Sequence, residues 1–397
     1  MSKINSLINK LCPNGVKYKN LGEVCSRIYA GGTPKTAYEE YYNGDIKWLR
    51  SGEINFNEVY DTEIKITELG LNNSSAKIIP KNSVVIAMTG ATVARTAMIM
   101  EDMSMNQSVC ALIPSAELNY RFLYQCLTNK YKELKESGQG VLTSLNLDRI
   151  KKISVPVPPL EVQEEIVRIL DKFGELEAEL EVELEARKSQ YEFLRGKLLS
   201  KEDSFKPIKN ILKNYCSGAT PLKGNSDFYE NGDIPWLRTQ EVRFNEIVKT
   251  ECFITKFALE KTGVKYIPAN CVIVAMSGAT AGRCAINKIP LTTNQHCLNL
   301  EVDSSKANYK YVYYCMCNAY DDLTSKKEGA RGDLNSSKII NQKIPIPSLE
   351  EQERIVNILD KFDKLVNDIS VGLPAEIEYR RKQYEYYRNK ILSFEEV

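Results

Sequence analysis

The sequence is very poor in histidine, with His296 the only one among 397 residues. A catalytic triad or an acid–base pair in each half of the chain would need more than one imidazole, so most such schemes are excluded. The eleven cysteines form no CxxC motif, and a single histidine cannot complete a Cys/His zinc site of the usual spacing. We therefore expect reduced, buried cysteines that act as small hydrophobic side chains, and no metal site.

Long apolar runs are also missing. No run reaches the length of a membrane span, and the first residues, MSKINSLINKLCPNG, lack the apolar core of a signal peptide. We therefore expect a soluble, cytoplasmic protein with no membrane partner. The net charge of +1 is not that of a protein whose whole surface binds a polyanion. Charge is unevenly distributed, however, because residues 161–200 hold eleven acidic and six basic residues, which leaves the rest of the chain net basic.

The motifs of nucleotide chemistry are absent as well. The chain has no Walker loop, no GxGxxG opening and no DPPY-like or NPPY-like tetrapeptide of an adenine methyltransferase. Glu63 before Lys65 could mimic part of a nuclease motif, but the second half of the chain does not repeat it. We therefore expect a non-catalytic recognition protein that binds no cofactor itself.

What the sequence does contain is a repeat that spans most of its length. NGDIKWLR (43–50) returns as NGDIPWLR (231–238), and each copy holds one of the two tryptophans. At the same offset IPKNSVVIAMTGATVAR meets IPANCVIVAMSGATAGR, and PVPPLEVQEEIVRILDKF (156–173) meets PIPSLEEQERIVNILDKF (345–362) one residue further on. The chain is therefore a tandem duplication of a unit of roughly 190 residues, about the size of a domain plus a connector.

The first part of each copy mixes strand and helix signals. SVVIAM and CVIVAM are short β-branched runs bounded by Pro-x-Asn and Gly, which is typical of buried strands. Gly-Gly-Thr-Pro and Gly-Ala-Thr-Pro predict loops, and YRFLYQCLTNKYKEL predicts a helix. This part of each copy is predicted to be a compact α/β domain.

The second part of each copy predicts a long helix. Apolar residues recur at alternating steps of three and four, as at the a and d positions of a coiled coil. In the first copy they are Ile166, Leu170, Phe173, Leu176, Leu180, Leu184, Tyr191, Leu194 and Leu198. In the second they are Ile355, Leu359, Phe362, Leu365, Ile369, Leu373, Ile377, Tyr384, Tyr387 and Ile391. The four extra residues of the second copy, around Pro374, predict a kink or interruption.

We expect the two helices to pair as an antiparallel coiled coil; the alternative is a conventional amphipathic core helix in each copy. A helix over 162–199 would be roughly 57 Å long and would hold two domains tens of ångströms apart. The predicted fold is α/β, with two tandem mixed domains at 1–157 and 201–346. The long helices are predicted at 158–200 and 347–397.

G-x-T-P, NGDI-x-WLR and [ST]-G-A-T occur in this order in both copies, each time before a long helix. This whole-chain pattern resembles the specificity subunit of type I restriction–modification systems. The resemblance implies two target recognition domains, each reading half of a split site in double-stranded DNA, and a coiled coil that sets the gap and docks two methyltransferase subunits. Restriction/translocase subunits would join them. S-adenosylmethionine would belong to the methyltransferase and ATP to the motor subunits. A two-headed adaptor for proteins or glycans is the alternative.

The family pattern often has a second glycine after the Gly-x-Thr turn. Gly282 fits this pattern in the second copy, but the first copy has Ala94. If the position requires a positive φ, Ala94 is strained or the turn differs.

Residues that both copies share are expected to serve folding, phosphate contact or partner docking, whereas residues that differ at matched loop positions can read bases. The candidate DNA contacts of the first copy are Thr33, Lys35, Arg50, Ser51, Glu53, Thr89, Thr92, Arg95, Asn106, Gln107 and Thr143. Those of the second copy are Thr220, Lys223, Arg238, Thr239, Gln240, Ser277, Thr280, Arg283, Asn294, Gln295, His296 and Arg331.

The residue types suggest different tasks. Arg50 and Arg238 suit a phosphate or structural role because both copies have them, whereas Gln240 suits adenine and Arg331 suits guanine. The hydroxyl and glycine residues of the [ST]-G-A-T loops suit phosphate oxygens, or form a plain strand-ending turn. The loop with Arg331 is otherwise a solvated loop. For Trp48 and Trp236 we expect core packing, with base stacking as the alternative.

Overall fold

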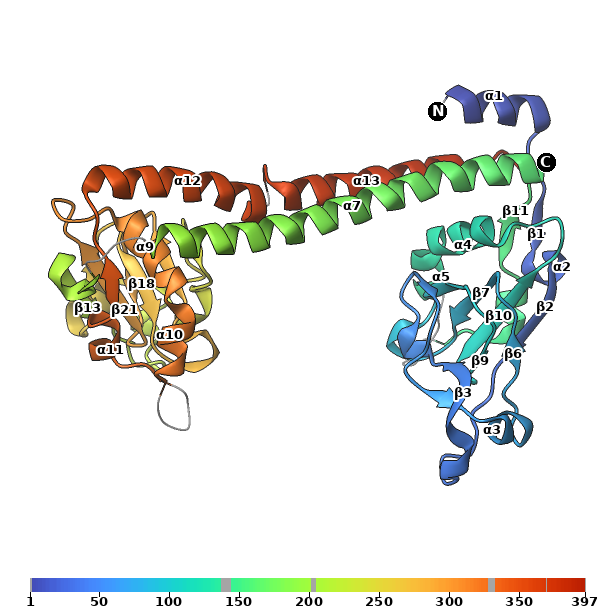
Figure 1. Cartoon of the computed structure of the whole chain (residues 1–397), viewed down its shortest axis with the longest axis horizontal. Helices are drawn as coiled ribbons and strands as arrows, with labels where there is room; N and C mark the ends of the chain where they lie inside the picture. Colours follow the sequence, from blue (N-terminus) through green and yellow to red (C-terminus); the bar gives the residue numbers. More distant parts are fainter. Residues whose placement is uncertain (1, 137–143, 201–204, 328–332, 369, 397) are drawn as a thin grey trace. The chain divides into compact units, whose positions relative to one another are not determined.

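The computed structural model describes residues 2–136, 144–200, 205–327, 333–368 and 370–396 (Figure 1). The chain divides into two compact units, which we call unit 1 (residues 1–180 and 377–397) and unit 2 (residues 181–376). The boundary falls inside one continuous helix, α7 (Leu160–Leu198). Each unit therefore combines one copy of the α/β domain with about half of α7 and a helix from the C-terminal region.

The main sheet of unit 1 has five strands in the order β2 (Cys25–Ala30), β10 (Val109–Pro114), β7 (Ser83–Ala87), β8 (Thr96–Ile99) and β4 (Asn57–Val59). All neighbours are antiparallel except β4 and β8. Every residue of the SVVIA run in β7 is buried, as predicted for a core strand. Unit 2 repeats the order with β13 (Leu212–Ser217), β21 (Cys297–Val302), β18 (Val272–Ala275), β19 (Cys284–Asn287) and β15 (Asn245–Ile247).

A smaller four-stranded sheet carries the tryptophan. In unit 1 its order is β5 (Lys65–Ile66), β3 (Tyr42–Leu49), β9 (Met103–Met105) and β6 (Ile78–Ile79). Because β3 and β9 are parallel, their carboxyl ends meet at one edge of the sheet. In unit 2 the corresponding strands are β16 (Cys252–Ile254), β14 (Ile234–Leu237), β20 (Leu291–Thr293) and β17 (Tyr266–Ile267).

Short helices and one strand pair complete each domain. In unit 1 they are α1 (Ser2–Leu11), β1 (Tyr18–Asn20), α2 (Leu21–Val24), α3 (Glu68–Asn72), α6 (Leu147–Lys151) and β11 (Ser154–Pro156), with β1 paired to β11. In unit 2 they are β12 (Phe205–Pro207), α8 (Lys256–Lys261), α10 (Tyr320–Ser325), α11 (Ser336–Ile340) and β22 (Lys343–Pro345), with β12 paired to β22.

One helix covers the main sheet in each unit, α4 (Tyr120–Asn129) in unit 1 and α9 (Tyr309–Asn318) in unit 2. An asparagine caps each start, because the Asn119 side chain accepts hydrogen bonds from two backbone N–H groups and Asn308 accepts one. The sequence predicted a single helix over YRFLYQCLTNKYKEL. The structure instead ends α4 at Asn129, with Lys130 as its C-cap, and begins α5 (Tyr131–Glu136) at the next residue.

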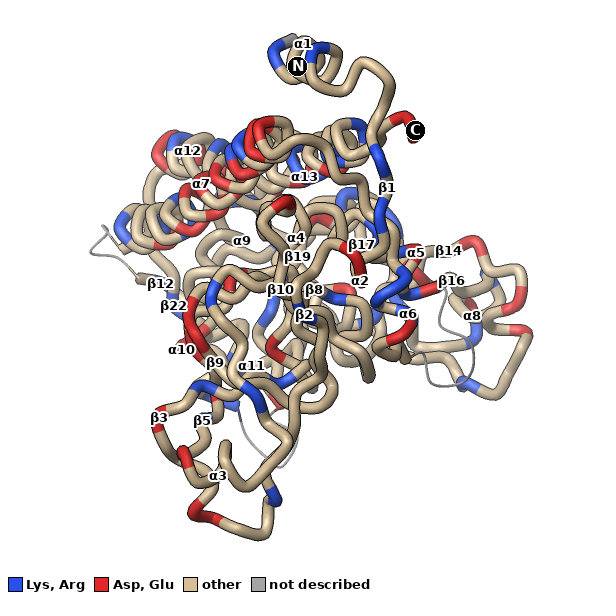
Figure 2. Tube along the Cα trace, turned by 90° about the vertical axis from the view of Figure 1, so that its right-hand side faces the viewer, with Lys and Arg blue, Asp and Glu red and all other residues tan. Residues whose placement is uncertain are grey.

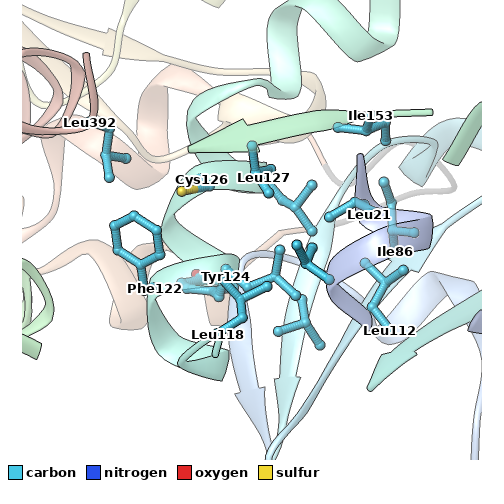
Figure 3. Close-up of a cluster of buried hydrophobic side chains, with 14 of the residues drawn as sticks. Leu21, Ile86, Leu112, Leu118, Phe122, Tyr124, Cys126, Leu127, Ile153 and Leu392 are labelled. Atoms are coloured by element: carbon cyan, nitrogen blue, oxygen red, sulfur yellow. The ribbon is translucent and has the colours of Figure 1, made fainter. Parts of the chain in front are cut away.

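The core of unit 1 lies between this helix and the sheet. Figure 3 shows Leu127 of α4 on the side toward Ile86 and Leu112 of the sheet, whereas Phe122 lies on the side toward Leu392. Phe122, Leu127, Ile86 and Leu112 are all fully buried. Leu392, from helix α13 (Leu373–Leu392), points into the same cluster. Each such side chain contributes about 1.5–3 kcal/mol to the free energy of folding. The C-terminal helix is therefore part of the folding unit of the first domain.

The start of α7 is tied to the domain by Gln163, whose side chain is fully buried. Its amide donates to the carbonyls of Glu117 (2.9 Å) and Pro158 (2.8 Å), and its carbonyl accepts from the backbone of Asn119 (2.8 Å). Gln352 repeats two of these contacts, with Asn308 and Pro347, at the start of α12 (Leu349–Asn367) in unit 2.

The helices of unit 1 pair antiparallel (Figure 1). The Phe173 ring of α7 stacks on Tyr384 and Tyr387 of α13, with ring centroids 6.0 and 5.6 Å apart. One turn later along α7, Glu177 pairs with Arg381, which lies earlier in α13. In unit 2 the second half of α7 packs on α12, where the Tyr191 hydroxyl donates to Asp363 at 3.4 Å. Figure 2 shows both signs of charge along these helices, as expected for their solvent-facing sides.

Two details of the heptad prediction need correction. Leu176 and Leu365 are 48% and 38% exposed, so neither lies in the helix seam. In unit 2 the neighbouring Val366 is buried instead, because a straight helix of 3.6 residues per turn drifts out of a 3.5-residue repeat. The predicted interruption is present: α12 ends at Asn367, and Pro374 lies in the first turn of α13, where proline is tolerated. Ile369 lies outside the described residues.

Candidate nucleic-acid interface

Four loops of unit 1 come together where β2, β3, β7 and β9 end. Backbone N–H groups of Gly32, Asn106 and Met88 donate to the carbonyls of Met105 (3.0 Å), Leu49 (2.9 Å) and Ser108 (2.8 Å), which joins three of the loops. The 3-10 helices η2 (Ser51–Glu53) and η3 (Gly90–Thr92) also contact each other. We call loops 31–35, 50–55, 88–95 and 106–108 loop cluster 1. Its counterpart in unit 2, loop cluster 2, comprises 218–223, 238–243, 276–283 and 294–296.

Cluster 2 is held by equivalent bonds. Ala219, Asn294 and Met276 donate to the carbonyls of Thr293 (3.0 Å), Leu237 (3.0 Å) and His296 (2.8 Å). The fold therefore brings together, in each unit, the four loops that hold most of the candidate DNA contacts: the Thr-Pro loop, the loop after the tryptophan strand, the [ST]-G-A-T loop and the Asn-Gln loop.

The first glycine of G-x-T-P is required by close approach of another strand end. A Cβ on Gly31 would lie 2.1 Å from the Met105 carbonyl oxygen, and one on Gly218 would lie 1.9 Å from that of Thr293. Atoms of a real side chain cannot come so close. Both glycines therefore allow the Thr-Pro loop to lie directly on the end of β9 or β20.

The buried tryptophans position the Thr-Pro loop by hydrogen bonds from their indole N–H groups. Trp48 and Trp236 are 5% and 7% exposed, and each indole N–H donates to the loop, at Gly32 O (3.0 Å) and Ala219 O (3.1 Å). A tyrosine packs edge-on against each indole and donates its hydroxyl to the loop proline carbonyl. The tryptophans are therefore core residues that position the loop, as expected, and are too buried to stack on a base.

The Asn-Gly pair that opens NGDI-x-WLR serves the backbone turn before the tryptophan rather than a site. Asn43 and Asn231 have positive φ angles of 61° and 55°, which asparagine tolerates better than most residues. In unit 1 the β3–β5 register shifts at the same point, so the pair bends the strand that carries the tryptophan. In unit 2 the pair lies directly before that strand, which begins at Ile234.

Arg50 and Arg238, at the ends of these strands, are neutralised by carboxylates. Arg50 pairs with Glu63 and lies 3.5 Å from Glu53, and Arg238 pairs with Glu251 at 2.7 Å. Glu53 also accepts the backbone N–H groups of Arg50 (3.1 Å) and Glu63 (2.9 Å), so it braces two segments. The guanidinium groups of Arg50 and Arg238 are thereby engaged within the protein, which favours a structural role for these arginines over a phosphate contact.

Glu241 takes the place of Glu53 in unit 2. It is 8% exposed and accepts the backbone N–H groups of Arg238 (3.0 Å) and Glu251 (2.8 Å). Both clusters therefore use a glutamate to shape the loop after the tryptophan strand.

Arg95 and Arg283, at the ends of the [ST]-G-A-T loops, are in the opposite electrostatic situation. Within the described residues, neither has a carboxylate at ion-pair distance. Arg95 donates to the side chain of Asn55 at 2.9 Å. The pKa of the Tyr131 hydroxyl is lowered, mainly by a hydrogen bond with Lys135 and to a smaller extent by Arg95. This side of cluster 1 therefore stabilises negative charge.

The turn before these arginines is the same in both units. Ala94 has a φ of 66° and Gly282 a φ of 91°, and each donates its N–H to the strand before it, at Ala87 O (2.9 Å) and Ala275 O (2.8 Å). The sequence left open whether Ala94 is strained or the turn differs between the copies. The structure shows the same turn in both units, with strain at Ala94. A non-glycine residue in this region costs about 1–2 kcal/mol.

The Asn-Gln loops combine a structural and an exposed residue. The side-chain oxygens of Asn106 and Asn294 accept the N–H two residues on, at 3.1 Å, so they shape the turn. Gln107 and Gln295 are exposed and contact the hydroxyls of Thr33 and Thr220. His296 is exposed beside Gln295, where the shorter-chained Ser108 stands in unit 1.

The remaining candidates lie at the surface of the clusters. Gln240 is exposed, and its amide lies 3.4 Å from Glu251. Lys35, Lys223 and Thr89 are exposed, whereas a second group is partly exposed: Ser51, Thr92, Thr239, Ser277 and Thr280. Thr143 and Arg331 lie outside the described residues. The sequence candidates omitted Asn55 and Arg243, which the structure places in the clusters. The sequence signal for these two residues was the exchange of asparagine for arginine directly before a shared Phe-Asn pair, in INFN (54–57) and VRFN (242–245).

An ion-paired triad ties each domain to its helix. In unit 1 Arg121 pairs with Glu58 of β4 (2.9 Å) and Asp171 of α7 (3.4 Å). In unit 2 Lys310 takes the same place, 2.7 Å from Asp360 and 3.9 Å from Glu246. The orientation of the loop cluster relative to the helix start is thus fixed in the same way in each unit.

Chemistry at these sites is limited by what the clusters contain. Among the described residues, no group of three His, Cys, Asp or Glu side chains could hold a metal ion. All eleven cysteines are free, and burial raises the pKa of several, to about 12 for Cys25 and Cys110. In the parts of the chain that the structure describes, no helix has both the length and the apolar character needed to cross a membrane.

Known proteins resemble the chain in both sequence and structure. A family model described as the type I restriction modification DNA specificity domain matches twice, at residues 13–186 and 204–379. The specificity subunit of the type I restriction enzyme EcoR124I/EcoR124II from Escherichia coli is 32% identical over 385 residues, covering 88% of this chain and 95% of that protein. A putative specificity subunit from Haemophilus influenzae is 32% identical over 73% of this chain and 76% of its own length.

Solved structures share the fold. A chain from a study of complex assembly and conformational transition of the type I R-M system aligns with a TM-score of 0.69, 16% identity and coverage of 96% and 98% of the two chains. The HsdS subunit from Thermoanaerobacter tengcongensis aligns with a TM-score of 0.55, 15% identity and 96% coverage of both. The chain belongs to the family of type I restriction–modification DNA specificity subunits, and not to that of the catalytic subunits.

Proposed function

We propose that this chain reads a bipartite site in double-stranded DNA, with loop cluster 1 on one half-site and loop cluster 2 on the other. The two target recognition domains are residues 1–157 and 201–346. The observation that carries the proposal is a shared loop framework with different side chains at matched surface positions, such as the partly exposed Ser108 against the exposed His296. Two readers of unlike half-sites need this combination, because shape is held constant while base contacts change.

Electrostatics supports DNA as the ligand. Arg95 and Arg283 have no carboxylate partner among the described residues, whereas the arginines after the tryptophan strands do. An arginine of this kind beside small hydroxyl residues is suited to phosphate oxygens. We assign Arg95 and Arg283 to phosphate contacts that are independent of sequence.

The long helices, at 158–200 and 347–397, would set the unread gap between half-sites. They would also dock two methyltransferase subunits, which restriction/translocase subunits would join. S-adenosylmethionine and ATP would bind those partners, and this chain would need no cofactor. The working location would be the cytoplasm, where the DNA is accessible.

The test is the methylome of a host that expresses this chain with its methyltransferase subunit. We expect a split, non-palindromic motif with an unread gap. A contiguous palindrome, or no new methylation, would contradict the proposal. A host that expresses the methyltransferase subunit alone is the control.

Salt dependence provides a second test. Binding of the purified complex to duplex DNA should weaken steeply with salt concentration, because each neutralised phosphate releases counterions. Arg95→Ala and Arg283→Ala should each lower the slope of log K against log salt by about one and weaken all DNA sequences alike. A flat salt response would instead favour an adaptor for proteins or glycans.

A further inference from the structure

Arg243 stands at a position where the two units have the same backbone but different side chains. It precedes Phe244, as Asn55 precedes Phe56, and both phenylalanines have a positive φ of 60° and 56°. The turn closes in the same way, because the backbone N–H groups of Asn55 and Arg243 each donate at 2.8 Å to an asparagine two residues on. The exchange of side chain is therefore not linked to a change of fold.

The two side chains are used differently. Asn55 accepts a hydrogen bond from Arg95 and so helps to orient that residue. Arg243 is exposed and has no carboxylate at ion-pair distance among the described residues. Among the described residues, the one hydrogen bond of its side chain runs from Nε to the backbone carbonyl of Gln240 at 2.7 Å.

This bond determines which edge of the guanidinium group is available. With Nε held by Gln240, the outer edge of the guanidinium group, where each terminal nitrogen has one N–H parallel to the other, is left for another partner. Two parallel N–H donors are the arrangement that pairs with O6 and N7 of guanine in the major groove. The contact also limits rotation of a long side chain before DNA arrives, which reduces the entropy lost on binding.

We propose that Arg243 reads one guanine in the half-site bound by unit 2. The proposal rests on the proposed function and names a base contact for the same loop cluster. Arg238 cannot take this role because Glu251 and Glu241 engage its guanidinium group. Arg283 is matched by Arg95 in unit 1, so it serves a contact that both half-sites need. Arg243 has no charged counterpart, as expected of a residue that distinguishes one half-site from the other.

The test compares methylomes of complexes that carry wild-type chain, Arg243→Lys or Arg243→Ala. Lysine retains the positive charge but cannot form the bidentate contact. We expect both variants to lose preference for one G·C pair in one half-site, by about 5- to 150-fold against the other three bases. All other positions of the motif should keep their preference. Asn55→Ala is the matched variant in unit 1: it removes the contact that orients Arg95 and should weaken methylation without changing which bases are preferred in that half-site.

The outcomes separate this proposal from the function it rests on. If the wild-type motif is not bipartite, the proposed function fails. If the wild-type motif is bipartite but Arg243→Lys and Arg243→Ala leave it unchanged, only the base contact is wrong. Uniformly weaker methylation by Arg243→Ala, with wild-type behaviour of Arg243→Lys, would show a phosphate contact and would also overturn it. Wild-type thermal unfolding midpoints and co-purification with the methyltransferase subunits verify folding.

Discussion

Units 1 and 2 differ least where the chain is most strained. Positive φ angles occur at Asn43 and Asn231, at Phe56 and Phe244, and at Ala94 and Gly282. The chain keeps these turns even where the residue type does not favour them, as at Ala94. What varies instead is the chemistry of side chains that project from the turns. Local backbone shape, more than residue identity, is therefore the constraint that the two copies share.

The helices follow the same rule. Tyr191 and Tyr384 are equivalent residues, and an arginine four positions on stacks over each ring, at 5.5 and 5.2 Å. Yet Tyr191 contacts Asp363 in unit 2, whereas Tyr384 contacts Gln125 in unit 1. The second half of α7 thus does in unit 2 what α13 does in unit 1.

The largest expected effect follows from this equivalence. A chain truncated at Ser200 lacks α13, so the apolar face around Phe173 and Leu170 has no cover. A second copy can supply the cover with the equivalent second half of its own α7. We expect a dimer at micromolar concentration by light scattering and, with methyltransferase subunits, methylation of a symmetric site.

The control for the truncation is Phe173→Glu in the shortened chain, which places a charge where Phe173 stacks on α13 in the full chain and should yield monomers. A monomeric truncated chain without that substitution would show that α7 halves do not replace α13.

The next prediction concerns Gly32, where unit 2 has Ala219. A Cβ on Gly32 would lie 2.3 and 2.5 Å from backbone atoms of Ser75 and Ala76, whereas the counterpart of Ser75 in unit 2 is Gly263. We expect Gly32→Ala to destabilise unit 1 by about 3 kcal/mol and addition of Ser75→Gly to restore part of the loss.

The reverse change, Ala219→Gly, should cost unit 2 only about 0.5–1 kcal/mol. Urea unfolding followed by fluorine NMR of 5-fluorotryptophan reports each unit separately, because each has one tryptophan. Equal losses from Gly32→Ala and Ala219→Gly would refute the packing difference.

A smaller effect is expected at the matched turn. Ala94→Gly should relieve strain and stabilise unit 1 by up to about 1 kcal/mol, less the loss of a buried methyl group. Gly282→Ala should destabilise unit 2 by about 1–2 kcal/mol, because φ is 91° and the new Cβ would lie 3.1 Å from Thr324 and 3.3 Å from the Tyr320 ring. The same fluorine signals measure both, and changes of the same sign would argue against a shared turn.

The smallest expected effect is a pH dependence of the stability of unit 2. It arises from Asp363, whose counterpart in unit 1, Gly174, cannot titrate. Partial burial raises the pKa of Asp363 above its usual value of 3.8. A carboxyl with a higher pKa in the folded state stabilises most when protonated, so its contribution falls as pH rises above about 4. Asp363→Asn should therefore make unit 2 more stable at neutral pH and remove this part of its pH dependence.

The measurement is the urea midpoint of the unit 2 signal, wild type against variant, from acidic to neutral pH. The unit 1 signal serves as the internal control, and its urea midpoint at each pH should be the same in the wild type and the variant. A difference between wild type and variant that does not vary with pH would rule out titration of Asp363.

The sequence sufficed for features that depend on pattern over many residues. The duplication, the buried strands, the paired helices and the core role of Trp48 follow from periodicity, burial and repetition. Leu176 could not be placed, because a one-residue drift of the helix seam is invisible in the heptad pattern. Nor could the partners of Arg50, because Glu63 is thirteen residues away and reaches it only across the folded sheet. The exchange of Asn55 for Arg243 is visible in the sequence, but Arg243 was missed because the sequence does not show that this residue lies in a loop cluster.

The turn closed by Asn57 or Asn245 has a consequence for evolution. Because an asparagine two residues on closes this turn, the side chain at Asn55 or Arg243 does not itself close it. A point mutation there can alter what one copy binds while the other copy and the fold remain intact. Gene duplication would thus have produced two heads that can diverge independently, with new specificities reached by single-codon steps rather than by rebuilding a loop.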